Sequence, residues 1–353
     1  MSFAYVGGYT EPDRNGRGEG IYVYRMDDTT GRWEPVQVLG GVKNPSFLAL
    51  SRDGRFLYAV NGGDAGGASA LARDPATGKL ALLNTVSVRA NNPAHIAVDA
   101  TGRYAVTANY SAGSVSVVPI GPDGQLGEPT DVRRHEGPTG PSPRQDGPHP
   151  HMVGVAPGGR FLLVNDLGLD KTFVYTLDLA SGRLVPNDPP YGEAPPGAGP
   201  RHLAFHPNGR WVYVINELAS TISQFAWDDA TGRLEWLAVV STLPAGFEGS
   251  NSTAQIVVHP NGRCVYGSNR GHDSIAIFRV AAADGALELV GHEPTQGRTP
   301  RNFNVDPRGQ FLYAANQDSD TVVAFRIEEE GARLLPTGQV VRAGSPSCVI
   351  FAA

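Results

Sequence analysis

Two histidines separated by one proline, His149 and His151 in the stretch GPHPHM, are well suited to chemistry. A His-x-His pair can ligate a metal ion, provided that a third ligand and an orienting carboxylate lie nearby. A single neutral imidazole can instead take a proton from water or from a substrate. A third interpretation is a turn in which histidine only makes hydrogen bonds. The choice depends on where the fold places this segment.

A repeat runs along the chain and defines the elements that must position these residues. Its turn glycines are Gly54, Gly102, Gly159, Gly209, Gly262 and Gly309, at intervals of 47 to 57 residues. Each turn joins an apolar strand to a second strand rich in Val, Tyr and Phe, as in GPRHLAFHPNGRWVYVIN, and a third strand such as TISQFAW and a fourth follow. Four short strands per repeat predict an all-β protein, a β-propeller with four antiparallel strands per blade.

The two ends of the chain together supply a seventh repeat. SPSCVIFAA, from Ser345 to Ala353, has the pattern of a first strand with no hairpin after it. FAYVGGYT, GIYVYRMD and WEPVQVLG near the start have the patterns of second, third and fourth strands. We therefore expect a single domain over residues 1–353, a seven-bladed propeller whose last blade is closed by the C-terminal inner strand. Such closure removes the free sheet edges that favour aggregation.

Alignment of the repeats brings polar residues to one edge of the predicted ring. The first strand of most repeats begins after a proline and the second ends at an asparagine, so both positions lie at the same mouth of the central channel. The residues one position after the proline are Ser46, Ala94, His151, Arg201, Ala254 and Arg301. Those one position after the asparagine are Gly62, Tyr110, Leu167, Glu217, Arg270 and Gln317. Because unpaired charge is costly to bury, this recurrence favours a polar pocket over solvated loop-end charge.

This mouth is rich in arginine, which opposes binding of a divalent cation, so we expect no metal site. His151 is then predicted to be a catalytic or substrate-binding residue, and His149, one step further out, a weaker contact. The remaining histidines of the repeat are predicted to have structural or surface roles: His95 and His202 facing the sheets, and His206 and His259 on the surface at the opposite turn.

These residues lie in segments that resemble the seven-bladed lactonase family, and the likeness covers essentially the whole chain. The matching segments are YVGGYT, GPSPRQDGPHPH, FEGSNSTAQIVVHPNGRCVYGSNRGHDSIAIF and TPRNFNVDPRGQFLYAANQDSDTVVAFRI. The family's PHAH is PHPH here, so Pro150 stiffens the segment and both histidines are kept. Bacterial members include 6-phosphogluconolactonase, and fungal relatives include carboxy-cis,cis-muconate cyclase.

The resemblance implies a hydrolase that opens an anionic lactone without a metal or other cofactor. It implies catalytic roles for His151, Arg201, Glu217 and Arg270, and we expect further substrate contacts from His149, Arg301, Arg144 and Gln317. Either His151 or Glu217 could be the general base, and nearby arginine would lower the pKa of the glutamate, which favours His151. The expected substrate is 6-phospho-D-glucono-1,5-lactone, from the pentose phosphate pathway. A muconate-type cycloisomerase and a non-catalytic scaffold are the alternatives.

Composition limits the partners. The formal net charge of −6 argues against nucleic acid and anionic membranes and leaves a small anionic lactone as the expected ligand. Cys264 and Cys348 lie in apolar runs without metal-binding spacing, as in a reduced cytoplasmic protein. The first residues lack the basic and apolar regions of a signal peptide, and no stretch is long enough to span a membrane. The oligomeric state stays open.

Overall fold

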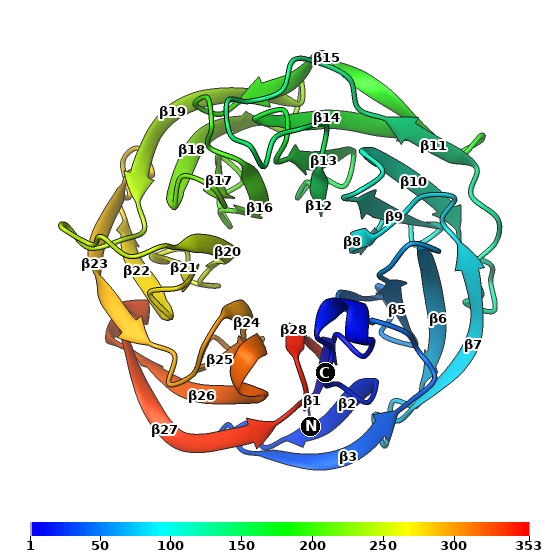
Figure 1. Cartoon of the computed structure of the whole chain (residues 1–353), viewed down its shortest axis with the longest axis horizontal. Helices are drawn as coiled ribbons and strands as arrows, with labels where there is room; N and C mark the ends of the chain where they lie inside the picture. Colours follow the sequence, from blue (N-terminus) through cyan, green and yellow to red (C-terminus); the bar gives the residue numbers. More distant parts are fainter. Residues whose placement is uncertain (1, 353) are drawn as a thin grey trace.

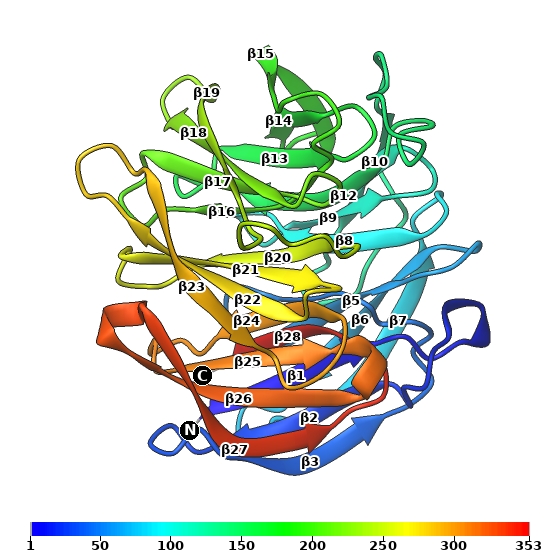
Figure 2. The ribbon, with the colours of Figure 1, turned by 60° about the vertical axis from the view of Figure 1, so that its left-hand side comes forward.

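The repeats fold into seven four-stranded antiparallel sheets that surround a central axis, as predicted (Figure 1). The computed structural model describes residues 2–352. The inner strands β8, β12, β16, β20, β24 and β28 approach the axis, and the outer strands form the rim (Figure 1). The tilted view shows the sheets stacked side by side as blades (Figure 2). No helix within residues 2–352 has the length and apolar character needed to cross a membrane.

Six blades are continuous in sequence, and their strands run from the axis to the rim in chain order. They are β4 (Leu48–Leu50), β5 (Phe56–Asn61), β6 (Gly67–Arg73) and β7 (Leu80–Ser87); β8 (Pro93–Val98), β9 (Tyr104–Asn109), β10 (Ser114–Pro119) and β11 (Asp131–Arg134); β12 (Pro150–Val155), β13 (Phe161–Asp166), β14 (Lys171–Asp178) and β15 (Arg183–Glu193); β16 (Pro200–Phe205), β17 (Trp211–Asn216), β18 (Thr221–Asp228) and β19 (Arg233–Ser241); β20 (Ser252–Val258), β21 (Cys264–Arg270), β22 (Ser274–Val280) and β23 (Leu287–Pro294); and β24 (Pro300–Val305), β25 (Phe311–Asn316), β26 (Thr321–Glu328) and β27 (Arg333–Arg342).

The seventh blade joins the two ends of the chain. It contains β28 (Pro346–Ala352), β1 (Ser2–Gly8), β2 (Ile21–Met26) and β3 (Trp33–Leu39). Strand β28 pairs antiparallel with β1, with Tyr5 opposite Ile350, so the predicted closure is confirmed for the described residues. Met1 and Ala353, the ends of the predicted domain, lie outside the described residues. Three short 3-10 helices occur in the described chain: η1 (Pro12–Arg14), η2 (Gln317–Ser319) and η3 (Glu329–Gly331).

Adjacent blades are joined by buried tyrosines in the second strands. The hydroxyl of Tyr213 donates a 2.7 Å hydrogen bond to the carbonyl of Gly285 in the next blade. Four other tyrosines make equivalent bonds to a glycine carbonyl of the following blade: Tyr5, Tyr58, Tyr266 and Tyr313. These bonds satisfy polar groups that burial between the sheets would otherwise leave unpaired.

The turn histidines contribute to the same contacts, so their predicted surface position was wrong. His206 and His259 are buried. Each donates from Nε2 to a glycine carbonyl of the next blade, that of Gly262 at 2.7 Å and that of Gly309 at 2.9 Å, respectively. The glycine at 262 has a positive φ of 74°, which only glycine adopts readily in such a turn. The sequence pattern identified the turn correctly, but the packing against the neighbouring blade was not visible in it.

Candidate active site

A β-bulge at the start of the inner strands directs the first column of predicted residues toward the axis. Pro150 pairs with Asp166 and Met152 with Asn165, so His151 is the extra residue between them. The same shift in register isolates Arg201 and Arg301 on their strands. A bulge disrupts the ladder locally and redirects a side chain, and it is common beside active sites. The repeat therefore explains why these three residues share one mouth.

Glu217 lies at the centre of an arginine cluster at this mouth. Its Oε2 is 2.8 Å from Nε of Arg201 and 3.2 Å from Nη2 of Arg270, and its Oε1 accepts from Nη2 of Arg144 at 3.0 Å. Arg201 and Arg270 also donate to the carbonyls of Ala254 and Thr253. Charge-assisted bonds of this kind fix the positions of the guanidinium groups.

The cluster borders a cavity of about 260 Å³ to which every blade contributes. One lining residue from each blade, in ring order, is Tyr9, Ser46, Tyr110, His151, Glu217, Arg270 and Arg301. Arg144, from the connection before β12, and Arg14, from η1, complete the cationic part of the wall. Among the described lining residues four are arginines and one is a carboxylate, so the cavity has an excess of positive charge.

The arginines set the ionisation of Glu217. Burial by itself raises the pKa of this carboxyl, but the charges of Arg270, Arg201 and Arg144 outweigh it and hold the pKa well below its ordinary value. The carboxylate is therefore ionised at neutral pH, with both oxygens engaged. A carboxylate in this state is a weak general base.

His151 has the opposite character, because it is neutral and has a ring nitrogen with no partner. Burial, with the charges of Arg201, Arg301 and Arg270, holds the pKa of its imidazole well below the ordinary value. The residue is 5% exposed, and its Nδ1 is buried without a hydrogen bond. Its ring also meets the ring of Tyr110 edge-on, at 5.6 Å between centroids. A neutral imidazole that lines the cavity can accept a proton there.

Arg201 lies deeper than expected for a residue that contacts substrate. It is 2% exposed and is absent from the described residues that line the cavity. Its contacts with Glu217 and with the Ala254 carbonyl suit a positioning role. Arg301, in the same column of the repeat, lines the cavity and stacks over the ring of Tyr9, with its guanidinium carbon 5.4 Å from the ring centroid.

Two of the predicted substrate contacts, His149 and Gln317, are likewise absent from the described lining residues. His149 stacks on the ring of Tyr110 with centroids 4.6 Å apart, and its Nε2 lies 2.8 Å from Oδ1 of Asp146. It therefore supports the cavity wall from behind. Gln317 begins η2, and its backbone carbonyl accepts a bond from Arg17.

The lining residues that the sequence analysis did not select as site residues include Tyr9, Arg14 and Tyr110. Tyr110 stands in the same column as Glu217, so the pattern contained a signal for it. Tyr9 stands in this column too, because Gly8 pairs with Pro346 as Asn216 pairs with Pro200. Arg14 lies further along the connection between β1 and β2 and gave no signal.

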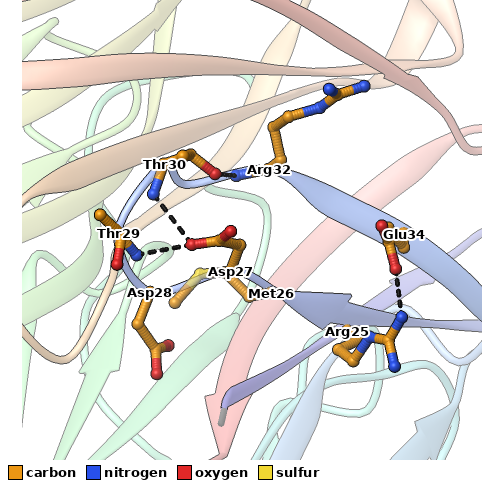
Figure 3. Close-up of a pocket in the computed structure, with 8 residues that line it drawn as sticks. All are labelled: Arg25, Met26, Asp27, Asp28, Thr29, Thr30, Arg32 and Glu34. Carbon is orange, nitrogen blue, oxygen red and sulfur yellow. Dashed lines mark hydrogen bonds and ion pairs between the residues drawn. The ribbon is translucent and has the colours of Figure 1, made fainter.

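No group of three or more His, Cys, Asp or Glu side chains that could hold a metal ion occurs among residues 2–352. A larger hollow, of about 630 Å³, lies at the β2–β3 turn and shares no described lining residue with the mouth cavity (Figure 3). There the carboxylate of Asp27 accepts the backbone N–H groups of Thr29 and Thr30, and Arg25 pairs with Glu34 (Figure 3). These charges are engaged within their own hairpin, so the mouth cavity is the candidate active site.

Comparison with known proteins agrees with this fold. A family model described as the seven-bladed β-propeller lactonase matches residues 3–351. The 6-phosphogluconolactonase of Bacillus subtilis is 35% identical over 98% of this chain and 97% of its own. The solved periplasmic gluconolactonase of Pseudomonas aeruginosa is 35% identical, with a TM-score of 0.93 over 100% of this chain and 99% of its own. The chain therefore belongs to the seven-bladed β-propeller lactonase family and is a lactone-hydrolysing enzyme.

Proposed function

We propose that the substrate is a phosphorylated sugar lactone, 6-phospho-D-glucono-1,5-lactone, which the protein opens to 6-phosphogluconate in the pentose phosphate pathway. The observation that carries the proposal is the charge of the cavity, which is lined by four arginines and one carboxylate. The guanidiniums of Arg144 and Arg270 are engaged by Glu217, whereas Arg301 stacks on Tyr9. Arg301 and Arg14 are thus placed to bind a phosphate, for which arginine is well suited.

In the proposed reaction His151 is the general base. Its neutral imidazole takes a proton from a water molecule while the water oxygen adds to the lactone carbonyl. Arg270 donates to the oxyanion that forms, as a fixed cation does in other acyl-transfer sites. The bond between the carbonyl carbon and the ring oxygen then breaks, and protonated His151 returns the proton to the ring oxygen. One water is consumed, and no other reactant is needed.

Glu217 and Arg201 act by position in this scheme. The carboxylate of Glu217 holds three guanidiniums that would otherwise repel one another. The charge of Arg201 contributes to keeping His151 neutral. The two residues therefore maintain the geometry and the electrostatic field in which base and oxyanion donor work.

The proposal needs neither metal nor cofactor, and it places the protein in the cytoplasm, with the chain as a single domain. The B. subtilis relative, named 6-phosphogluconolactonase, supports a phosphorylated substrate. The P. aeruginosa relative is named a periplasmic gluconolactonase, so an unphosphorylated lactone and a periplasmic location are the alternatives to be tested. Cys264 and Cys348 are buried and unbonded, which suits a reducing compartment.

The test is a comparison of kcat/KM for the phosphorylated and unphosphorylated lactones, corrected for spontaneous hydrolysis, with EDTA present throughout. Hydrolysis of the phosphorylated lactone is followed by NADP-coupled oxidation of its product, 6-phosphogluconate. We expect the phosphorylated lactone to be preferred about tenfold to hundredfold, the value of one or more charge-assisted hydrogen bonds.

Arg301→Gln is expected to remove most of that preference, whereas Arg298→Gln, at a position outside the described lining, serves as the matched control. Equal turnover of both lactones would contradict the phosphorylated substrate. Activity lost in EDTA and restored by a divalent ion would contradict the metal-free mechanism.

A further inference from the structure

His151 contacts a group of side chains beneath the cavity that have no part in the scheme above. Phe47, His95, His151, His202 and Gln255 come from five consecutive blades and meet around the axis. The ring of His202 is 5.1 Å from that of His151 and 5.6 Å from that of His95, between centroids. His202 was predicted to be a satisfied structural residue, but its Nε2 is buried without a hydrogen bond.

The contact between His202 and Gln255 determines which nitrogen of His202 carries hydrogen. Nδ1 of His202 lies 2.5 Å from the amide oxygen of Gln255, which can only accept, so Nδ1 is the donor. Burial, with the charge of Arg201, holds the pKa of His202 well below its ordinary value, so the ring is neutral. Its Nε2 is then an acceptor, and it lacks a donor.

The missing donor is available on the neighbouring ring. Nδ1 of His151 is also buried and unpaired, and the two rings are adjacent. Buried polar groups are almost always hydrogen-bonded, directly or through an ordered water. If the neutral His151 carries its hydrogen on Nδ1, this nitrogen is a donor and Nε2 of His202 is the acceptor that it lacks.

We infer that Gln255 and His202 are positioning residues that fix the tautomer of His151, through hydrogen bonds from Nδ1 of His151 toward Nε2 of His202 and from Nδ1 of His202 to Gln255. The bond between the two rings is direct or passes through one water. This arrangement leaves the lone pair of His151 on Nε2, the form that a base needs at the cavity. The catalytic part of the inference rests on the proposed function, whereas the tautomer does not.

The other groups near these rings are compatible with this assignment. Arg201, Arg270 and Arg301 can only donate, and all three disfavour a charged His151. Nδ1 of His95 accepts the backbone N–H of Val153 at 3.4 Å, and burial lowers the pKa of His95 to about 3, so this ring is also neutral. The group therefore contains no carboxylate that would turn either His151 or His202 into a cation.

The test is NMR of ¹⁵N-labelled protein, in which two-bond correlations identify the protonated nitrogen of each histidine without any substrate. In the wild type we expect His151 to carry hydrogen on Nδ1, and His202 likewise. His202→Phe retains the packing against Phe47 and removes the acceptor, so His151 should shift to the Nε2–H form or to a mixture. Gln255→Leu removes the acceptor for Nδ1 of His202 and should have the same effect.

Kinetics provide the second readout. The two disrupting variants should lower kcat by about tenfold to hundredfold with little change in KM, the usual effect of losing a partner that orients a working histidine. His95→Phe, one ring further away, is the matched control and should leave the tautomer of His151 unchanged.

An Nε2–H form of His151 in the wild type, or no change in His202→Phe and Gln255→Leu, would overturn the inference. If His202→Phe does not fold, the milder change at the half-buried Gln255 still decides it. The expected tautomers together with no turnover of any lactone would overturn the proposed function and leave the inference intact.

Discussion

His151 and His149 differ in their surroundings although they are two residues apart. His151 lines the cavity, whereas His149 is absent from its described lining, and both ring nitrogens of His149 are engaged, by the Tyr110 carbonyl and by Asp146. A general base has to reach the reacting water, so proximity in sequence does not give the two residues the same role.

We expect His151→Asn to lower kcat by about 10²- to 10⁴-fold, the usual loss for a general base, with the fold retained. His149→Asn is the matched control and should cost less than tenfold, since it weakens only the support behind Tyr110. Steady-state kinetics, corrected for spontaneous hydrolysis, give the values, and circular dichroism checks folding. Wild-type turnover in a folded His151→Asn protein would remove His151 from the mechanism.

The arginines also determine the pH dependence. A base is active when neutral, so kcat/KM should be constant above the pKa of His151 and fall as the pH drops through it. Because burial and arginine lower this pKa, the fall should occur below about pH 6.5, the ordinary value for histidine. Arg301→Gln removes one positive charge and should move the fall to higher pH. A shift to lower pH, or the same shift in Arg298→Gln, would contradict this explanation.

Glu217 contributes to stability as well as to the site. Its side chain is 6% exposed and that of its partner Arg201 is 2% exposed, so neutralising one leaves the other uncompensated. We expect Glu217→Gln to lower the free energy of unfolding by about 3 kcal/mol. Arg144→Gln removes a partner whose side chain is 54% exposed, and its cost should be at most about 1 kcal/mol. Urea denaturation of both variants measures the two free energies of unfolding. Equal losses of stability in the two variants would show that burial of the ion pair is not the cause.

At the scale of the elements, contacts between blades depend on groups at the ends of strands. The Tyr213 hydroxyl reaches the Gly285 carbonyl, and both are buried. Tyr213→Phe should therefore cost about 1–2 kcal/mol of unfolding free energy, because it leaves that carbonyl without a donor. Tyr191→Phe, at a half-exposed position on β15, is the control and should be close to neutral. A neutral Tyr213→Phe would indicate that water replaces the hydroxyl.

The repeat made most of the fold and part of the site predictable. Every blade uses the same hairpin, so the column that contains His151, Arg201 and Arg301 identified one edge of the ring correctly. The sequence could not show how deeply each of these side chains is buried at the mouth, because this depends on the neighbouring blades. Arg201 is buried behind Glu217, whereas Arg301 lines the cavity. Arg14 lies in a connection without a counterpart in the other repeats, so no column could reveal it.

For the whole molecule, the ring is closed by a strand from the opposite end of the chain. Cys348 and Val349 of β28 belong to the buried clusters on the two sides of the seventh blade. Without β28 these clusters are opened and β1 becomes a free inner edge, which invites aggregation. The seven blades should therefore unfold in a single transition that depends on the last residues of the chain.

Deletion of residues 345–353 should abolish this transition and give an aggregating chain.

A circular permutant distinguishes loss of the strand from a mere change of terminus. Phe3 pairs with Ala352, so a short turn can join the end of β28 to the start of β1. New termini in the exposed β2–β3 turn would then leave all four strands of the blade present. We expect this permutant to be soluble, with one cooperative thermal transition by calorimetry. A truncated chain that keeps the wild-type transition, or several transitions in the intact protein, would contradict closure by β28 as the condition for a single folding unit.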